Sequence, residues 1–438
     1  MRLTEKPMLL VGAARQIINP ELGHHICGYG PNYANTGVHD DLSVTALYLN
    51  DGTREAVFLN FDLIGLMQAT VARIRKAVAR ACRVKADNVF LACTHVHSGP
   101  EVIEQFVVKG WPSRNCRADY MQRLEDWSLR AAREAKANAE ECQLRYNFAY
   151  AEENMNRRYN FPDRRFLYVP DNKQLLGQSR EYVDRELGII AFRRKGTLNQ
   201  YKAVITNYTC HPLCVGNSSN LITADFQGVL RRRVEETFEG CLCLSTTGAA
   251  GDNHPLQPES GFATAEEMGT RLGRLAIMRC YDAVPADYDT QLRLAYPSIT
   301  LPFKDAETRQ MLPEGQARKQ KPFTKQKSYK TYISLLGIGP VLLAGFPGEP
   351  VAELGAMLKW SSPFLKTYAL FTATDCAGYF PTQNQFYWGG YEPDTSLFAR
   401  GTGEAMVQRI VQTAEQLVRR QPLRLPALKA AGVDGVAR

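Results

Sequence analysis

Two histidines in the stretch Thr94–Pro100 (THVHSGP) have the spacing that most directly suggests metal chemistry. His95 and His97 follow the apolar run Asn88–Thr94, which reads as a buried strand. If the strand continues through them, alternation places both imidazoles on one face. Ligands of open α/β sheets gather at the carboxyl ends of strands. The pair is therefore a candidate metal site, and two histidines with structural hydrogen bonds are the alternative.

Four further polar residues lie a few positions beyond apolar, strand-like runs: His211, Asp252, Glu349 and Tyr379. In a mostly parallel sheet such strand ends converge on one edge. Two histidines with a carboxylate are the ligand set of a catalytic zinc site that keeps an open position for water. Bound zinc lowers the pKa of that water to about 7. The simpler alternatives are that Glu349 caps the helix that follows it and that the loop around Asp252 is only a turn.

The elements that must position these residues alternate between strands and helices, which is typical of the α/β class. Apolar residues recur at helical spacing in the first predicted helix, Gln68–Cys82, which lies between two predicted strands and makes a β-α-β unit. The predicted strands are Ala56–Phe61, Asn88–Thr94, Gly188–Arg193, Tyr201–Thr209, Cys241–Thr246, Ile333–Leu336, Val341–Phe346 and Thr367–Thr372. The other predicted helices are Tyr120–Glu141, Phe226–Thr237, Ala263–Ala283, Val351–Leu358 and Gly403–Val418.

The length allows two to four domains or one large α/β unit. The chain has 438 residues, of which 45% are hydrophobic and 22% charged, and this excludes disorder or a coiled coil as the main state. We expect a single domain over residues 1–424, with residues 302–331 as an insertion or loop and residues 425–438 as a C-terminal tail. The eleven cysteines form no CxxC pair, so reduced, mostly buried thiols are expected.

Charge and hydropathy limit the expected partners and location. No apolar run is long enough to span a membrane, and Met1–Pro7 leads into too short an apolar stretch for a secretory signal, so we expect a cytoplasmic protein. The net charge is +8. The basic cluster Arg318–Lys330 has no nucleic-acid-binding motif beside it, which favours a solvated loop over nucleic-acid binding. Neither a stable membrane association nor a particular oligomeric state is indicated.

Taken together, these stretches resemble the catalytic N-terminal domain of the neutral/alkaline (non-lysosomal) ceramidase family. The likeness runs from Val11-Gly-Ala-Ala14 to Gly389-Gly-Tyr-Glu392, and its most specific parts are Thr94–Pro100 and Gly248–Pro255 (GAAGDNHP). The resemblance implies an α/β fold with a large mixed β-sheet flanked by helices. It also implies a zinc-dependent amidase that cleaves the N-acyl bond of a small molecule by zinc-activated water.

The resemblance also implies roles for individual residues. The implied Zn²⁺ ligands are His95, His211, Glu349 and Tyr379. His97 is implied to accept or relay a proton, and Arg157 of the Asn-Arg pair to contact the substrate. The loop that contains Asp252 and His254 is implied to position the substrate, and both residues are candidate catalytic residues. For His254 the roles considered are substrate binding and proton transfer, with a structural, hydrogen-bonded histidine as the alternative.

His254 is a departure from the family pattern, because it stands where ceramidases carry an essential serine. The family's usual secretion signal and C-terminal sandwich domain are not found in this sequence either. We therefore expect an N-acyl substrate that is smaller or more polar than ceramide. Two other functions stay open: a zinc-dependent esterase, lactonase or cyclic-amide hydrolase, and a non-catalytic binding protein on the same fold.

Overall fold

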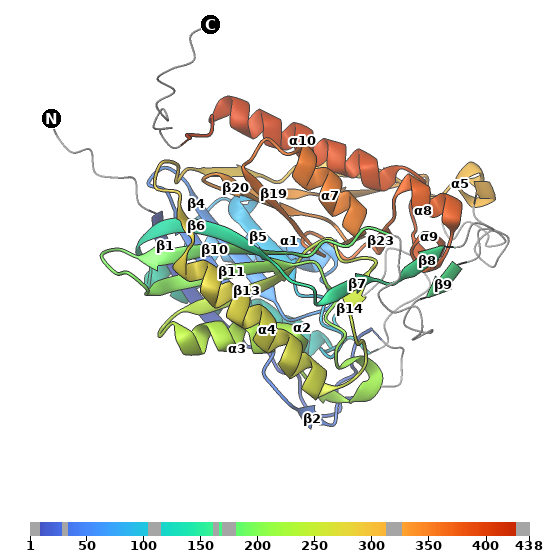
Figure 1. The fold of residues 1–438 in the computed structure, drawn as a ribbon, viewed down its shortest axis with the longest axis horizontal. Helices are drawn as coiled ribbons and strands as arrows, with labels where there is room; N and C mark the ends of the chain where they lie inside the picture. The colour runs from blue at the N-terminus through green and yellow to red at the C-terminus, as the bar shows by residue number, and fades with distance from the viewer. Residues whose placement is uncertain are drawn as a thin grey trace, which may run out of the picture.

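Two β-sheets packed face to face form the centre of the molecule (Figure 1). The computed structural model describes residues 9–28, 34–103, 115–160, 166–168, 181–311 and 326–425. Apolar side chains from both sheets make one continuous core between them, and helices cover the two outer faces. The order of layers is therefore helices, sheet, sheet, helices, which confirms the expected α/β fold with a large mixed sheet flanked by helices.

The larger sheet contains nine strands of the described chain, in an order that differs from their order in the sequence. Its strands in spatial order are β13 (Leu242–Thr247), β11 (Tyr201–Tyr208), β10 (Glu186–Arg194), β6 (Glu140–Tyr150), β1 (Leu9–Ile17), β3 (Ser43–Asn50), β4 (Glu55–Phe61) and β5 (Val89–Cys93), with β15 (Val284–Pro285) beside β6. Side chains of successive residues point to opposite faces of a strand. In β3, accordingly, Val44 and Ala46 pack under the outer helices, whereas Leu47 and Leu49 face the second sheet.

The second sheet has the order β16 (Leu292–Ala295), β19 (Ser334–Ile338), β20 (Val341–Gly345) and β22 (Lys366–Leu370). Short two-stranded pairs complete the strands: β2 (Gly37–Val38) with β12 (Leu221–Ile222), β7 (Asn154–Asn156) with β14 (Asn253–Pro255), β8 (Arg158–Asn160) with β9 (Phe166–Tyr168), β17 (Ser298–Pro302) with β18 (Ser328–Tyr332), and β21 (Glu349–Pro350) with β23 (Tyr379–Phe380).

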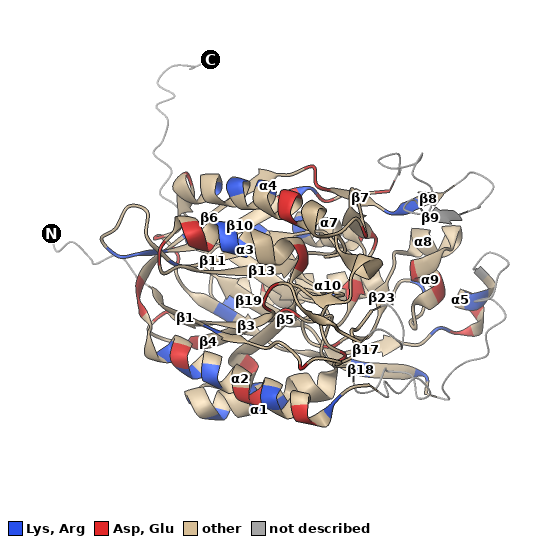
Figure 2. Ribbon diagram, turned by 90° about the horizontal axis from the view of Figure 1, so that it is seen from below, with Lys and Arg blue, Asp and Glu red and all other residues tan. Residues whose placement is uncertain are grey.

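The helices lie on the outer faces (Figure 1). Those over the larger sheet are α1 (Gln68–Cys82), α2 (Ala118–Ala137), α3 (Asp225–Thr237) and α4 (Phe262–Tyr281). Those over the second sheet are α7 (Ala352–Ser361) and α10 (Thr402–Arg420). The short helices are η1 (Ala86–Asn88), η4 (Gly216–Ser218), α5 (Ala306–Met311), α8 (Gln383–Trp388) and α9 (Tyr391–Thr395). Basic and acidic residues both occur on α2, α3, α4 and α10, whereas α1 carries Arg and Lys but no acidic residue (Figure 2).

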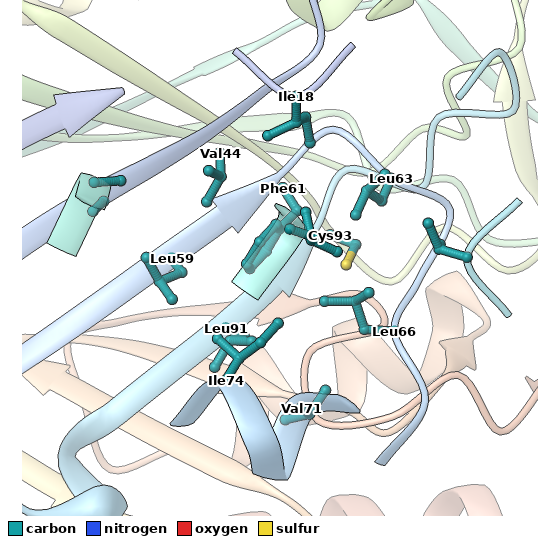
Figure 3. Close-up of a cluster of buried hydrophobic side chains, with 14 of the residues drawn as sticks. Ile18, Val44, Leu59, Phe61, Leu63, Leu66, Val71, Ile74, Leu91 and Cys93 are labelled. Carbon is teal, nitrogen blue, oxygen red and sulfur yellow. The ribbon is translucent and has the colours of Figure 1, made fainter. Parts of the chain in front are cut away.

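Helix α1 shows why the sequence pattern gives this packing. Val71 and Ile74 are buried against Leu59 and Leu91 of the two adjacent strands (Figure 3). The helix ends where Arg83 adopts the left-handed conformation, with φ of 55°, and its N–H bonds the carbonyl of Ala79. The prediction of a helix over Gln68–Cys82 is confirmed, and the parallel pairing of β4 with β5 confirms the β-α-β unit.

The larger sheet is not mostly parallel, which corrects the expectation on which the convergence of strand ends was based. Only β4–β5 and β11–β13 pair in parallel, and the neighbouring pairs between them are antiparallel. The ends converge for another reason, because the sheet curls until its two end strands meet. The Thr247 hydroxyl donates to the Thr94 carbonyl over 2.7 Å, and the Asn60 side chain donates to the Ser245 carbonyl over 2.7 Å.

One predicted helix ends earlier than expected, and two predicted segments lie partly outside the described residues. The helix expected over Tyr120–Glu141 is wrong at its end, because α2 stops at Ala137 and β6 begins at Glu140. The expected excursion over residues 302–331 leaves and returns through the antiparallel pair β17–β18, and its residues 312–325, with most of the basic cluster, lie outside the described residues. Of the expected tail, only residue 425 is described.

Ten of the eleven cysteines are buried thiols, as expected. Among the helices of the described chain, none combines the length and the apolar character that crossing a bilayer requires.

Candidate active site

His95 and His211 hold their rings in the same way, each with one nitrogen fixed by a backbone carbonyl. The Nδ1 of His95 lies 2.6 Å from the carbonyl oxygen of Ile64, and the Nδ1 of His211 lies 2.6 Å from that of Ala250. A carbonyl only accepts, so each Nδ1 must carry the proton and donate it. In the neutral form of either ring, Nε2 then carries the lone pair, which is the state of a histidine that ligates a metal.

The two lone pairs converge on one carboxylate oxygen. Oε2 of Glu349 lies 3.5 Å from Nε2 of His95 and 3.5 Å from Nε2 of His211. Glu349 is 8% exposed, and within the described part of the chain neither its Oε2 nor Nε2 of His211 has a hydrogen-bond partner. With both rings neutral, three buried acceptors face one another here, and a cation among them would remove their mutual repulsion. Tetrahedral ligands of zinc lie about 3.4 Å apart, so this spacing fits such an ion.

Local backbone structure brings these groups together. His95 has φ of 66°, in the left-handed region, and its N–H bonds the carbonyl of Leu63, so the chain turns sharply after β5. Glu349 and Tyr379 are register partners in the parallel pair β21–β23. This pairing places the phenol of Tyr379 beside the carboxylate, and a hydrogen bond from Tyr379 helps to lower the carboxylate's pKa.

The electrostatics keep His95 and Glu349 deprotonated at neutral pH. Burial lowers the pKa of His95 to about 4. Burial by itself raises the pKa of Glu349, but His95, His211 and Tyr379 outweigh it and hold the value at about 2. Burial, followed by the charge of Glu349, raises the pKa of Tyr379 well above its usual range.

His97 is the third histidine of the cluster. Its ring centroid is 4.9 Å from that of His95 and 5.9 Å from that of His211. One nitrogen from each of the three rings lies within 4.8 Å of the others, so His97 also has the position of a possible ligand. Burial, with the neighbouring histidines, lowers the pKa of His97 well below its usual value. Gly28 covers this ring so closely that a Cβ there would lie 2.5 Å from Nδ1.

Arg157 lies beside this cluster and is held by a buried carboxylate. Its Nε donates to Oε1 of Glu392 over 2.7 Å, and Nη1 of Arg158 donates to Oε2 of the same carboxylate. Glu392 is fully buried, and although burial raises its pKa, the two guanidinium groups lower it below its ordinary value. The rings of Tyr379 and Tyr391 lie 5.5 and 5.2 Å from the Arg157 guanidinium carbon, so a cation and two aromatic rings border the cluster.

His254 contacts both the cluster and Arg157. Its Nε2 lies 2.6 Å from Nη1 of Arg157, and its ring centroid is 5.2 Å from that of His211. Burial and then the charge of Arg157 lower the pKa of His254 well below its usual value. The side chain is therefore a neutral imidazole at the edge of the cluster.

The carboxylate of Asp252 accepts hydrogen bonds from neighbouring side chains and from the start of α7. Its Oδ2 accepts from the side chains of Asn156 and Gln385, each over 2.9 Å. Its Oδ1 accepts from the Asn253 side chain over 3.1 Å and from the backbone N–H of Ala352, the first residue of α7, over 2.9 Å. These four contacts are typical of a residue that fixes the loop before α7. The group chosen from the sequence as catalytic therefore has the surroundings of a positioning residue.

The structure thus brings all of the predicted site residues to one place: His95, His97, Arg157, His211, Asp252, His254, Glu349 and Tyr379. Sequence reasoning missed Glu392, which holds Arg157. The available signal was the dipeptide Gly389-Gly390 before it, whose φ angles of 70° and 98° favour glycine and turn α9 toward Arg157.

The fold and the site define a four-layer α/β protein with a buried histidine–carboxylate cluster suited to a divalent metal. The family model described as "Neutral/alkaline non-lysosomal ceramidase, N-terminal" matches residues 10–249, more than half of the chain. The chain belongs to the neutral/alkaline non-lysosomal ceramidase family, as the sequence motifs indicated.

Solved structures agree with this fold. The neutral ceramidase from Pseudomonas aeruginosa is similar with a TM-score of 0.77 and 18% identity, over 96% of this chain and 76% of that one. A structure described as a ceramidase complexed with C2 is similar with a TM-score of 0.75 and 17% identity, over 96% of this chain and 77% of that one. Among curated proteins, none matches this sequence.

Proposed function

We propose that this protein is a metal-dependent amidohydrolase, with zinc as the metal, that cleaves the N-acyl amide bond of a small molecule. The observation that carries the proposal is the convergence of two imidazole lone pairs on one buried carboxylate oxygen at 3.5 Å each. Imidazole and carboxylate with an open position are the ligands of catalytic zinc. His95, His211 and Glu349 would hold the ion, with Tyr379 beside the carboxylate. When bound, such an ion lowers the pKa of a water molecule and polarises a carbonyl group.

The surrounding residues divide the remaining tasks. His97 is a neutral imidazole beside both ligating histidines, and it accepts the proton of the attacking water. Arg157 presents a fixed positive charge that orients the acyl carbonyl and stabilises the negative charge developing on its oxygen. The rings of Tyr379 and Tyr391 flank this cation.

The substrate follows from the family and from one residue that differs. The solved relatives are named as ceramidases, which supports an N-acyl substrate. In this chain the imidazole of His254 occupies the space between Arg157 and His211. This bulk supports an acyl amide that is smaller or more polar than ceramide.

The decisive experiment measures the metal content and the hydrolysis of the same protein preparations. Inductively coupled plasma mass spectrometry of the wild type should give about one zinc per chain, and the variants His95→Ala and His211→Ala should give almost none. The matched control is His39→Ala, because His39 is half-exposed and its ring stacks on Phe262, away from the cluster. This control should keep the metal of the wild type.

A substrate panel then separates the reaction classes. N-acyl amides of increasing chain length, ceramide, simple esters and lactones are compared for kcat/KM. Turnover of a short N-acyl amide above the ester and the lactone supports the proposal. Preference for the ester or lactone would move the assignment to a zinc-dependent esterase or lactonase. A protein that takes up no metal even when reconstituted would refute the metal-dependent mechanism and favour a binding role.

A further inference from the structure

The contact between His254 and Arg157 fixes the hydrogen-bonding state of the histidine. Nη1 of Arg157 lies 2.6 Å from Nε2 of His254, and both side chains are buried. A guanidinium has only donors and stays protonated at every relevant pH. The Nε2 atom must therefore be the acceptor, and the ring's proton is on Nδ1. A histidine in this state cannot deliver a proton from Nε2 while the contact exists.

The backbone holds the two residues in register for this contact. Strands β7 and β14 pair antiparallel, with Asn156 opposite Asn253 and Met155 opposite His254. One step beyond this pair, the N–H of Arg157 bonds the carbonyl of Asp252 over 2.9 Å. The approach of the two side chains is thus built into the strand pair.

Arg157 is held from two sides and transmits its position to the cluster. Glu392 accepts from Nε over 2.7 Å, while His254 accepts from Nη1. The Arg157 guanidinium carbon in turn lies 5.5 Å from the centre of the Tyr379 ring, and Tyr379 is the register partner of Glu349. A change at His254 therefore reaches the carboxylate of the cluster through two intermediate side chains.

We propose that His254 is a positioning residue that holds the Arg157 guanidinium through the lone pair on Nε2, and that it does not transfer a proton in the reaction. This role rests on the proposed function, since Arg157 is the group that meets the acyl carbonyl. It differs from the catalytic role that the sequence motif suggested for His254. A side chain with an acceptor at the same place should therefore replace it, whereas one without an acceptor should not.

The test compares two substitutions of similar size. In His254→Gln the amide oxygen can accept from Nη1 in place of Nε2, and in His254→Leu no acceptor remains. We expect kcat/KM of the glutamine variant to stay within about threefold of the wild type. The leucine variant should lose about 10- to 100-fold, the factor that corresponds to a hydrogen bond to a charged group. Leu256→Ala is the matched control on the same segment, because Leu256 is 41% exposed, and it should behave like the wild type.

A double-mutant cycle shows whether His254 acts through Arg157. Arg157→Met and the double variant Arg157→Met/His254→Leu should have the same kcat/KM and the same zinc content. If the double variant loses a further 10-fold or more, or if His254→Gln is as inactive as His254→Leu, His254 has a catalytic role of its own and the proposal is wrong.

The same cycle measured by urea unfolding of the metal-free proteins does not depend on activity. His254→Leu should lower the unfolding midpoint in the wild type but not in the Arg157→Met background. Equal shifts in both backgrounds would refute the contact. If the wild type hydrolyses none of the substrates while this coupling persists, the proposed function fails and the pairing of Arg157 with His254 is confirmed.

Discussion

The carboxylate of Glu392 offers the sharpest test of the site's internal electrostatics. It is fully buried and accepts from two guanidinium groups, Arg157 over 2.7 Å and Arg158 at short range. The substitution Glu392→Gln keeps the shape but turns one acceptor into an NH₂ donor that faces a donor. Removing one partner of a buried ionic group costs about 3–5 kcal/mol, because the remaining charges stay buried without compensation.

That cost is large against a total stability of about 5–15 kcal/mol. With a urea m-value of about 3 kcal/mol/M, the unfolding midpoint of Glu392→Gln should fall by about 1–1.7 M at pH 7. The control Glu415→Gln removes only an exposed i,i+4 pair with Arg419, and it should change the free energy of unfolding by less than about 0.5 kcal/mol.

The pH dependence adds an independent check. Because Arg157 and Arg158 lower the pKa of Glu392, the folded protein releases this proton more readily than the unfolded chain. The stabilisation is therefore fully present above the ordinary pKa of about 4.3 and is lost as the pH falls through the lower value of the folded state. The difference between wild type and Glu392→Gln should be constant from pH 8 to 5 and should shrink below pH 4. A loss of less than about 1 kcal/mol in the free energy of unfolding at pH 7 would refute this reasoning. So would a difference between the two proteins that stays the same below pH 4.

Three further predictions concern other parts of the molecule. His97→Gln should keep the zinc content of the wild type but lower kcat by about 10²- to 10⁴-fold, and a parallel loss of zinc would show that His97 is instead a ligand. Burial lowers the pKa of Lys304 to about 8. Between pH 8 and 10 the unfolded chain therefore binds more protons than the folded protein, and the free energy of unfolding should rise with pH. In Lys304→Met this rise, measured by urea unfolding, should be smaller by about 2 kcal/mol. Gly12→Ala should destabilise the protein by at least about 1–3 kcal/mol in the same assay, because the new Cβ would lie 1.7 Å from the carbonyl oxygen of Ala135; a neutral effect would contradict the packing of α2 on β1.

Local sequence patterns predicted individual helices and strands better than they predicted the order of the strands in the sheets. The amphipathic helix Gln68–Cys82 and the hairpin of β10 with β11 follow from periodicity and a turn at Gly196, which are local signals. Strand β3 is buried on both faces, so no alternation in its sequence revealed it. The end of α2 was misplaced because helix-forming residues continue through Glu140 into the next strand.

The sequence predicted which residues form the candidate site, but it did not predict how the fold brings them together. His95, His211 and Glu349 were chosen because each follows an apolar run, and the structure brings them together. The parallel sheet assumed for this was wrong, since the ends meet through the curl of a mixed sheet and contacts such as Thr247 to Thr94. No local rule predicts such contacts between distant segments. For the same reason the sequence did not reveal that Glu392, which is distant along the chain, is the partner of Arg157.

The separation of the cluster residues along the chain has a consequence for how this protein is made. His95, His211 and Glu349 are each separated from the next by more than a quarter of the sequence. Contacts at such sequence separations slow folding, because long loops must close before these contacts form. A partly synthesised chain that ends before β21 lacks Glu349 and therefore cannot form the complete cluster. A ligand that needs the complete cluster binds the folded protein and not the unfolded chain, so it should slow both global unfolding and proteolysis.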